Sequence, residues 1–146
     1  MAAYATGLLA TFCCGVFFGA ALYISLVQHP AALETGDDFA ARFFAPMYRR
    51  AALMQASLAL AGSAAAAAAW LMAGGRLWLA AAVLLASAVP FTLVVIQPVN
   101  AALLGGRVSP AEPSALLIRW GRLHRARTAA SGLAFAACLF ALRGGA

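Results

Sequence analysis

An uninterrupted apolar run near the start of the chain most constrains how it can fold. Residues 4–27 contain no charged side chain. About 24 residues are enough to cross a hydrocarbon core about 30 Å thick, because each residue adds about 1.5 Å to a helix. The run therefore predicts a transmembrane helix.

Three more long apolar stretches follow, over about 50–74, 77–104 and 114–142. Of the 146 residues, 65% are hydrophobic and only 10% are charged, which excludes an ordinary soluble domain. We expect an all-α fold in which residues 1–146 form a single membrane domain, built as a bundle of four transmembrane helices. The last helix is the least apolar, because only residues 128–142 of it are free of charge.

Two prolines lie in the third predicted span, Pro90 inside it and Pro98 near its end. Each proline removes a backbone hydrogen bond from a helix. Each can therefore kink the helix at its position.

The longest polar stretch, residues 28–50, separates the first two predicted spans. Thr35 to Asp38 offer a helix N-cap before Phe39. A short interfacial helix lying on the membrane is expected here, between the first and second spans. The alternative is a lid that folds back over the bundle.

The charged residues indicate the orientation. All ten basic residues are arginines that flank apolar spans, so they favour membrane anchoring and exclude nucleic acid as a partner. Arg76 and Arg143 fall at the end that carries both termini, and all the other arginines and the four acidic residues fall at the opposite end. The positive-inside rule places the arginine-rich end in the cytoplasm and both termini on the non-cytoplasmic side of a bacterial inner membrane.

A stripe of small residues follows the first span, at Gly7, Thr11, Gly15 and Gly19. Residues four positions apart share a helix face, and small residues there let another helix approach closely. The stripe is a candidate surface for a homo-oligomer, in addition to the lipid bilayer as a partner.

Polar side chains from all four predicted spans reach one depth. Counting about 20 residues along each predicted helix from its non-cytoplasmic end leads each time to a position beside these polar residues. Trp120, His124 and Arg127 stand at i, i+4 and i+7, so they share one face. Ionisable groups inside a membrane usually face an interior cavity, which predicts a pocket here. Its residues are His29, Gln97, Asn100, Trp120, His124 and Arg127.

Each residue of this layer also has a structural interpretation. His124 can be an interfacial side chain bonded to a carbonyl, Trp120 a member of an aromatic belt, and His29 a helix cap before Pro30. Arg127 lies deepest and should need a partner. Its candidate partners are Glu34, Asp37 and Asp38.

Four motifs at these positions give the chain a family resemblance. They are His29-Pro30, Tyr48-Arg49, Gln97-Pro98-Val99-Asn100 and Trp120-x-x-x-His124-x-x-Arg127. With them the chain resembles the anthrone-oxygenase-like family of small four-helix membrane proteins, many of which have no assigned function. The resemblance spans most of the chain.

The resemblance implies an oxygenase. Characterised members of the family are associated with the oxidation of anthrone-type polyketides to anthraquinones by molecular oxygen. The implied substrate is a planar aromatic molecule, anthrone-like or phenolic. An anthrone reacts with oxygen through its enolate, so a base and a donor to the oxyanion would suffice without a cofactor.

The candidate site residues can be assigned roles in that reaction. His124 or His29 would be the base. Asn100, Gln97 or Arg127 would hold the oxyanion. The substrate would contact Trp120, Gln97, Tyr48, Phe43 and Phe44, with Trp120 and one phenylalanine as stacking walls.

A metal is an alternative. His29 and His124 with one of the carboxylates Glu34, Asp37 or Asp38 would form the facial triad that binds iron, and imidazoles also suit copper. The two histidines could instead be the axial ligands of a haem. The cofactor thus remains open between none, a transition metal and a haem.

A non-enzymatic function is the competing class. The chain would then be a carrier for a small lipophilic molecule or a subunit of a membrane complex. This interpretation accounts for the small-residue stripe but explains less well why polar residues converge at one depth.

Overall fold

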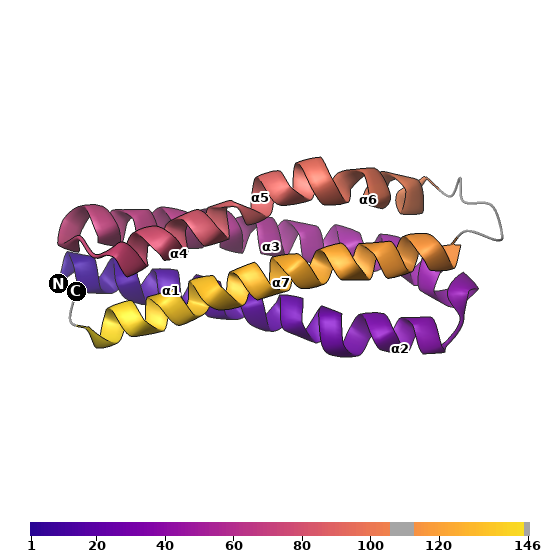
Figure 1. Ribbon diagram of the computed structural model, residues 1–146, viewed down its shortest axis with the longest axis horizontal. Coiled ribbons are helices and arrows are strands. Elements are labelled where there is room, and N and C mark those ends of the chain that lie inside the picture. Colours follow the sequence, from indigo (N-terminus) through magenta and orange to yellow (C-terminus); the bar gives the residue numbers. More distant parts are fainter. Residues whose placement is uncertain (106–112, 145–146) are drawn as a thin grey trace.

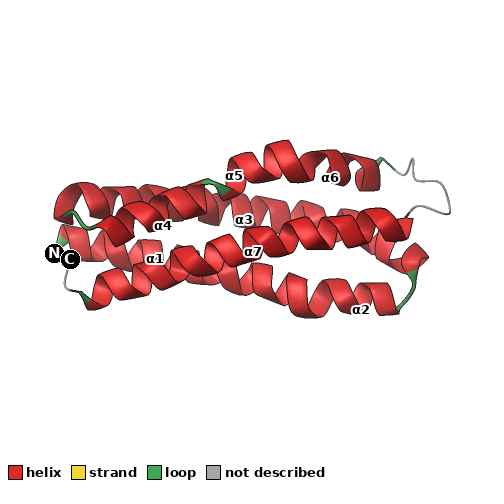
Figure 2. Ribbon diagram, viewed as in Figure 1, coloured by secondary structure: helices red, strands yellow, loops and turns green. Residues whose placement is uncertain are grey.

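The computed structural model describes residues 1–105 and 113–144. Within these ranges the chain is helical and contains no strand, as Figure 2 shows, so the prediction of an all-α fold is confirmed. The elements are α1 (Ala2–Tyr23), the π-helix η1 (Ile24–Gln28), α2 (His29–Glu34), α3 (Asp37–Ala73), α4 (Arg76–Ala86), α5 (Ala88–Phe91), the π-helix η2 (Thr92–Ile96), α6 (Gln97–Leu104) and α7 (Pro113–Arg143).

These elements form long rods that lie side by side (Figure 1). The first rod is α1–η1–α2, the second is α3, the third is α4–α5–η2–α6 and the fourth is α7. The turn between the second and third rods is made by Gly74 and Gly75, whose φ angles of 75° and 88° favour glycine. This turn lies at the same end of the molecule as the N-terminus and the end of α7 (Figure 1).

Three helical stretches are long and apolar enough to cross a membrane: Ala2–Glu34, Asp37–Ala73 and Arg76–Leu104. The chain is therefore an integral membrane protein. By composition α7 is not one of the three, because Arg119, Arg122, Arg125 and Arg127 lie in its first half. It nevertheless packs along α1 and α4.

The separate interfacial helix predicted between the first two spans is not present. Residues 37–50 are the first turns of α3, which continues through Pro46 without a break. Pro46 and Arg42, whose carbonyl loses its partner, are both exposed, so water can satisfy that carbonyl. In this part of α3 Phe44 is buried, with its ring edge-on to Trp120 and 5.2 Å between centroids.

Small residues allow the rods to pack closely. A side chain on Gly7 would lie 2.9 Å from the Trp78 ring of α4, and one on Gly15 would lie 2.9 Å from Phe135 of α7. At these two positions the small-residue stripe of α1 therefore contacts helices of its own chain.

Both π-helices end two residues before a proline. η1 precedes Pro30 and η2 precedes Pro98. A proline in a helix has no N–H for the carbonyl four residues earlier and clashes with it, and widening to a π turn relieves the conflict. The prolines thus place an irregular turn in the first and third rods.

The third rod is also interrupted at Ser87, between α4 and α5, three residues before Pro90. Beyond this point α5 and α6 are displaced outward relative to α4 (Figure 1). The predicted irregularities near Pro90 and Pro98 are confirmed, and the displacement makes room beside α3.

Candidate functional site

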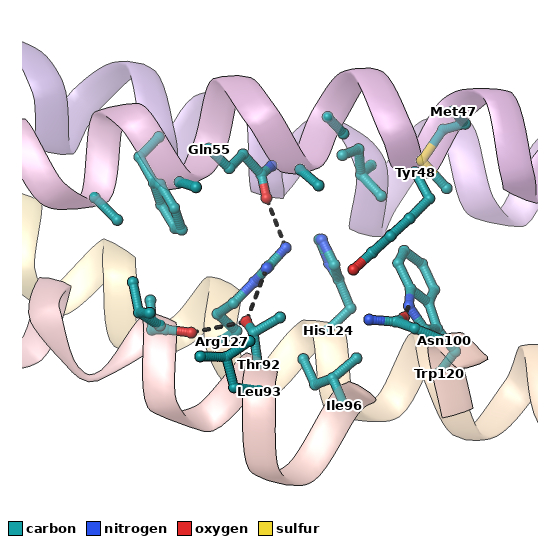
Figure 3. A pocket seen from close by; sticks show the side chains of 18 residues that line it. Met47, Tyr48, Gln55, Thr92, Leu93, Ile96, Asn100, Trp120, His124 and Arg127 are labelled. Carbon is teal, nitrogen blue, oxygen red and sulfur yellow. Dashed lines mark hydrogen bonds between the residues drawn. The ribbon is translucent and has the colours of Figure 1, made fainter. Parts of the chain in front are cut away.

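A cavity of about 210 Å³ lies between α3 and the α5–η2–α6 part of the third rod, with α7 and α1 completing it (Figure 3). Its walls are mostly apolar. Six polar side chains line it, and none of the described lining residues is acidic. The six are Tyr48, Gln55, Thr92, Asn100, His124 and Arg127.

His124 lies at the centre of the cavity and is only 1% exposed (Figure 3). Its Nδ1 atom is 3.0 Å from the Oγ of Ser25 on η1. Its Nε2 atom is buried and has no hydrogen-bond partner within the described part of the chain. One ring nitrogen is thus held by the helix bundle, while the other is unpaired in a ring that lines the cavity.

One arrangement of protons satisfies all three of the shortest contacts among Ser25, Thr128 and His124. Thr128 Oγ1 lies 3.0 Å from the carbonyl oxygen of His124, which can only accept, so Thr128 donates there. The 2.9 Å bond between Ser25 and Thr128 must then be donated by Ser25. Ser25 has no second proton, so it accepts from Nδ1–H of His124. In this arrangement Nε2 carries a free lone pair.

Arg127 extends across the cavity between α3 and η2 (Figure 3). It donates to Gln55 Oε1 at 2.7 Å and to Thr92 Oγ1 at 3.2 Å. Its guanidinium carbon also lies 5.7 Å from the centre of the Phe17 ring. Both hydrogen-bond acceptors are neutral oxygens.

The carboxylate predicted to pair with Arg127 is therefore replaced by an amide and a hydroxyl. Glu34, Asp37 and Asp38 are exposed, where α2 ends and α3 begins, and do not line the cavity. They are polar enough to remain in water, beyond the apolar part of the rods. The prediction of a carboxylate partner was wrong for this reason.

Trp120 is held at the cavity wall by an amide network. Its Nε1 donates to Asn100 Oδ1 at 2.9 Å, and Asn100 Nδ2 is 3.4 Å from Gln97 Oε1. The Tyr48 hydroxyl donates to the same Gln97 oxygen at 3.4 Å. Asn100 lines the cavity and Gln97 does not. Their hydrogen bonds position Trp120 and Tyr48.

His29 lies outside this cavity. It lines a much smaller one with Phe43 and Phe44. Its ring centroid is 5.1 Å from that of Trp120, and the Trp120 centroid is 4.7 Å from that of His124. Trp120 thus contacts both histidines, but of the two only His124 lines the large cavity.

The predicted metal triad does not form. Across residues 1–105 and 113–144, no three His, Cys, Asp or Glu side chains are grouped so that they could hold a metal ion. The carboxylates are exposed at the end of the bundle, away from the buried His124. A haem with both histidines as axial ligands would require them to face one space, whereas they line different cavities.

Four residues of the site were not predicted from the sequence: Ser25, Gln55, Thr92 and Thr128. Thr128 is four positions after His124, so helical periodicity could have found it. Gln55 is the only amide side chain in the second predicted span, 50–74, which is an unusual residue for a helix in lipid. Nothing in the sequence indicated that Ser25 and Thr92 belong to the site, because serine and threonine hydroxyls in helices often bond a backbone carbonyl of their own helix.

Comparison with known proteins supports the resemblance. A family model described as anthrone oxygenase matches residues 44–137, more than half of the chain. The match includes Gln55, Trp120, His124 and Arg127 of the cavity, and it excludes His29 and Ser25. No curated protein and no solved structure matches the chain. On the family match, the chain belongs to the anthrone oxygenase family.

Proposed function

We propose that this protein is a membrane-embedded oxygenase that uses molecular oxygen to oxidise a planar aromatic substrate, anthrone-like or phenolic. The observation that carries the proposal is the unpaired Nε2 of His124 in the same cavity as Arg127, whose Nε is also buried. A base and a cation in one apolar cavity suit the formation of an enolate. The family match is consistent with this chemistry.

The first step is a proton transfer. An anthrone carries a methylene group para to its carbonyl, and His124 Nε2 takes one methylene proton. The electron pair moves to the carbonyl oxygen. Arg127 and the unpaired Nε2 of Gln55 are the donors available for that oxyanion, and Ser25 accepts from Nδ1–H of the resulting imidazolium.

The second step consumes oxygen. The methylene carbon of the enolate bonds to O₂, which is reduced as the carbon is oxidised. The peroxide anion takes the proton back from His124 and becomes a hydroperoxide. Loss of the second methylene hydrogen as a proton, with cleavage of the O–O bond, gives the second carbonyl and water. The balance is anthrone plus O₂ to anthraquinone plus water.

Oxygen uptake tests this proposal. The protein in lipid nanodiscs should accelerate oxygen consumption by anthrone above the spontaneous rate, with anthraquinone as the product. His124→Ala should abolish the acceleration, and His29→Ala should retain most of it, because His29 does not line the cavity. Circular dichroism would verify that both variants fold. Full activity of folded His124→Ala would reject His124 as the base.

A steady absence of oxygen uptake across anthrones and phenols would favour the competing carrier function. The same cavity could then bind a lipophilic molecule without converting it. Binding measurements would separate the two, because only the oxygenase forms a product.

We also propose that α7 crosses the membrane as the fourth span, in a bacterial inner membrane. Because α7 packs along α1 and α4, it lies in the same layer as helices that are apolar enough to span. Four of its five arginines lie in its first half, toward the end opposite the termini. The positive-inside rule favours the cytoplasm for that end.

A further inference from the structure

The large cavity has more hydrogen-bond donors than acceptors. Arg127 has five N–H groups and no acceptor, and its buried Nε has no partner among the described residues. Because the Gln55 oxygen faces Arg127, the Gln55 Nε2 points elsewhere, and it too is buried and unpaired. Gln55 is only 3% exposed. The unpaired groups at the Arg127 end of the cavity are thus donors.

The cavity also carries an unbalanced positive charge. Arg127 bonds only neutral oxygens in the contacts around it, and no acidic side chain lines the described cavity wall. A buried cation without an anion is costly in a membrane. A ligand that brings a negative charge would balance Arg127 and pair with the free donors.

One side of the cavity opens between α3 and η2. Two residues that line it are also exposed on the outer surface, Ala56 on α3 and Leu93 on η2, the latter 63% exposed. At 1.5 Å per residue, each lies about 25–27 Å from the turn that joins α3 to α4, within a hydrocarbon core about 30 Å thick. The opening therefore faces lipid.

The cavity is smaller than sites that enclose a whole ligand, as expected for a site that is open on one side. Sites that enclose a drug-sized ligand measure about 300–1,000 Å³. The present cavity, at about 210 Å³, holds less than that. A ligand of several fused rings would place its polar end inside and leave part of its apolar body in the opening.

We propose that the cavity binds a lipophilic anion, a deprotonated phenol or carboxylic acid with a planar apolar body, that enters from the bilayer between α3 and η2. The anionic group lies at Arg127 and Gln55, and the apolar body lies between Ala56 and Leu93. This inference rests on the proposed function in taking the cavity as the substrate site. Binding alone tests it, so its failure and a failure of oxygenation are distinguishable.

The experiment compares two probes of nearly equal shape, anthracene-2-carboxylate and the neutral anthracene-2-carboxamide. The protein is held without oxygen in nanodiscs of phosphatidylcholine, and binding is followed by energy transfer from tryptophan to anthracene. The carboxylate should bind at least about tenfold more tightly, as expected for a buried charge pair. Equal binding of both probes to the wild-type protein would overturn the anionic class.

Arg127→Met should remove the preference for the carboxylate, because it weakens carboxylate binding much more than carboxamide binding. Arg125→Met is the matched control, since Arg125 is exposed two positions away on α7 and does not line the cavity. A preference that survives in Arg127→Met would overturn the role of Arg127. The wild-type comparison decides the ligand class even where Arg127→Met does not fold.

Ala56→Phe tests the route by filling the opening. It should slow the uptake of both probes from the bilayer, whereas Ala61→Phe, at an exposed alanine of α3 outside the cavity lining, should not. Unchanged uptake in folded Ala56→Phe would overturn entry between α3 and η2.

Discussion

Ser25 on η1 and His124 on α7 are joined by a buried contact of 3.0 Å between the serine Oγ and the imidazole Nδ1. The contact connects the first and fourth rods at the level of the cavity. In the arrangement that satisfies all three hydroxyl contacts, Ser25 donates to Thr128 and accepts from His124, which fixes the imidazole tautomer. A positioning residue for the proposed base thus comes from the helix that Pro30 distorts.

Removing the Ser25 hydroxyl should impair catalysis more than binding. In Ser25→Ala, Nδ1 loses its closer partner and keeps only the Thr128 hydroxyl at 3.4 Å, so the fraction of His124 with a free Nε2 lone pair falls. We expect kcat for anthrone oxidation to fall about 10- to 100-fold, part of what a general base contributes, with KM little changed. The ¹⁵N chemical shifts of the imidazole should report the changed tautomer.

Two variants control the Ser25 experiment. Ser57→Ala removes an exposed hydroxyl that bonds only its own helix, at Leu53, and should leave kcat unchanged. Ser25→Thr keeps an acceptor and should restore most of the rate. An unaltered kcat in Ser25→Ala would show that the contact is structural.

Gln55 should stabilise the transition state through Arg127. Gln55→Leu removes Oε1, the acceptor 2.7 Å from the Arg127 guanidinium that orients it. It also removes Nε2, an unpaired donor. Loss of one oxyanion donor costs about 10²- to 10³-fold in kcat in other enzymes, and we expect a loss toward the lower end of that range. Stopped-flow measurement of anthraquinone formation would check this.

Gln28→Leu is the control for Gln55, because Gln28 lines only the smaller cavity near His29. Its kcat should remain near that of the wild-type protein. Equal losses in the two variants would mean that Gln55 acts only through general stability.

Gly121 should be required for the packing of His29 on Trp120. A side chain there would lie 2.7 Å from His29 Nε2, and the ring cannot move away without disturbing Trp120. We expect Gly121→Ala to destabilise the fold by about 1–3 kcal/mol, as overpacking does elsewhere. Thermal unfolding in detergent would measure the loss.

Gly19 offers a matched comparison. It is also within a helix, but a side chain there would meet nothing within 4 Å. Gly19→Ala should therefore be neutral or slightly stabilising, since alanine favours the helix. If Gly121→Ala were as stable as Gly19→Ala, His29 would have to be free to rearrange.

Much of the site followed from helical spacing. Trp120, His124 and Arg127 could be placed on one face from their positions alone, and the structure brings all three to the cavity. The separation of His29 from His124 could not be predicted, because it depends on how Trp120 packs against both rings. The depth of a residue in the membrane gives its position along the helix axis, but it does not determine the direction in which the side chain points around that axis.

The errors have a common physical origin. A carboxylate partner for Arg127 and a separate interfacial helix were both expected because charged and polar residues follow each other in residues 28–50. In the structure Asp37 and Asp38 occupy the first turn of a continuous α3, where negative charge favours a helix N-terminus. Arg127 instead bonds the neutral amide of Gln55.

The orientation in the membrane can be tested with exposed arginines at opposite ends of the bundle. Arg42 lies near the start of α3, and Arg143 ends α7 beside the N-terminus; both side chains are exposed. The three native cysteines are buried, so they should react slowly with an impermeant maleimide. In intact cells Arg143→Cys should be labelled, and Arg42→Cys only after the cells are opened.

If the N-terminus is labelled from outside as well, the number of membrane crossings between it and Arg143 must be even. The other three rods supply three crossings, so α7 must be the fourth. Labelling of Arg42→Cys alone in intact cells would reverse the orientation, and labelling of both would show that α7 does not place its ends on opposite sides.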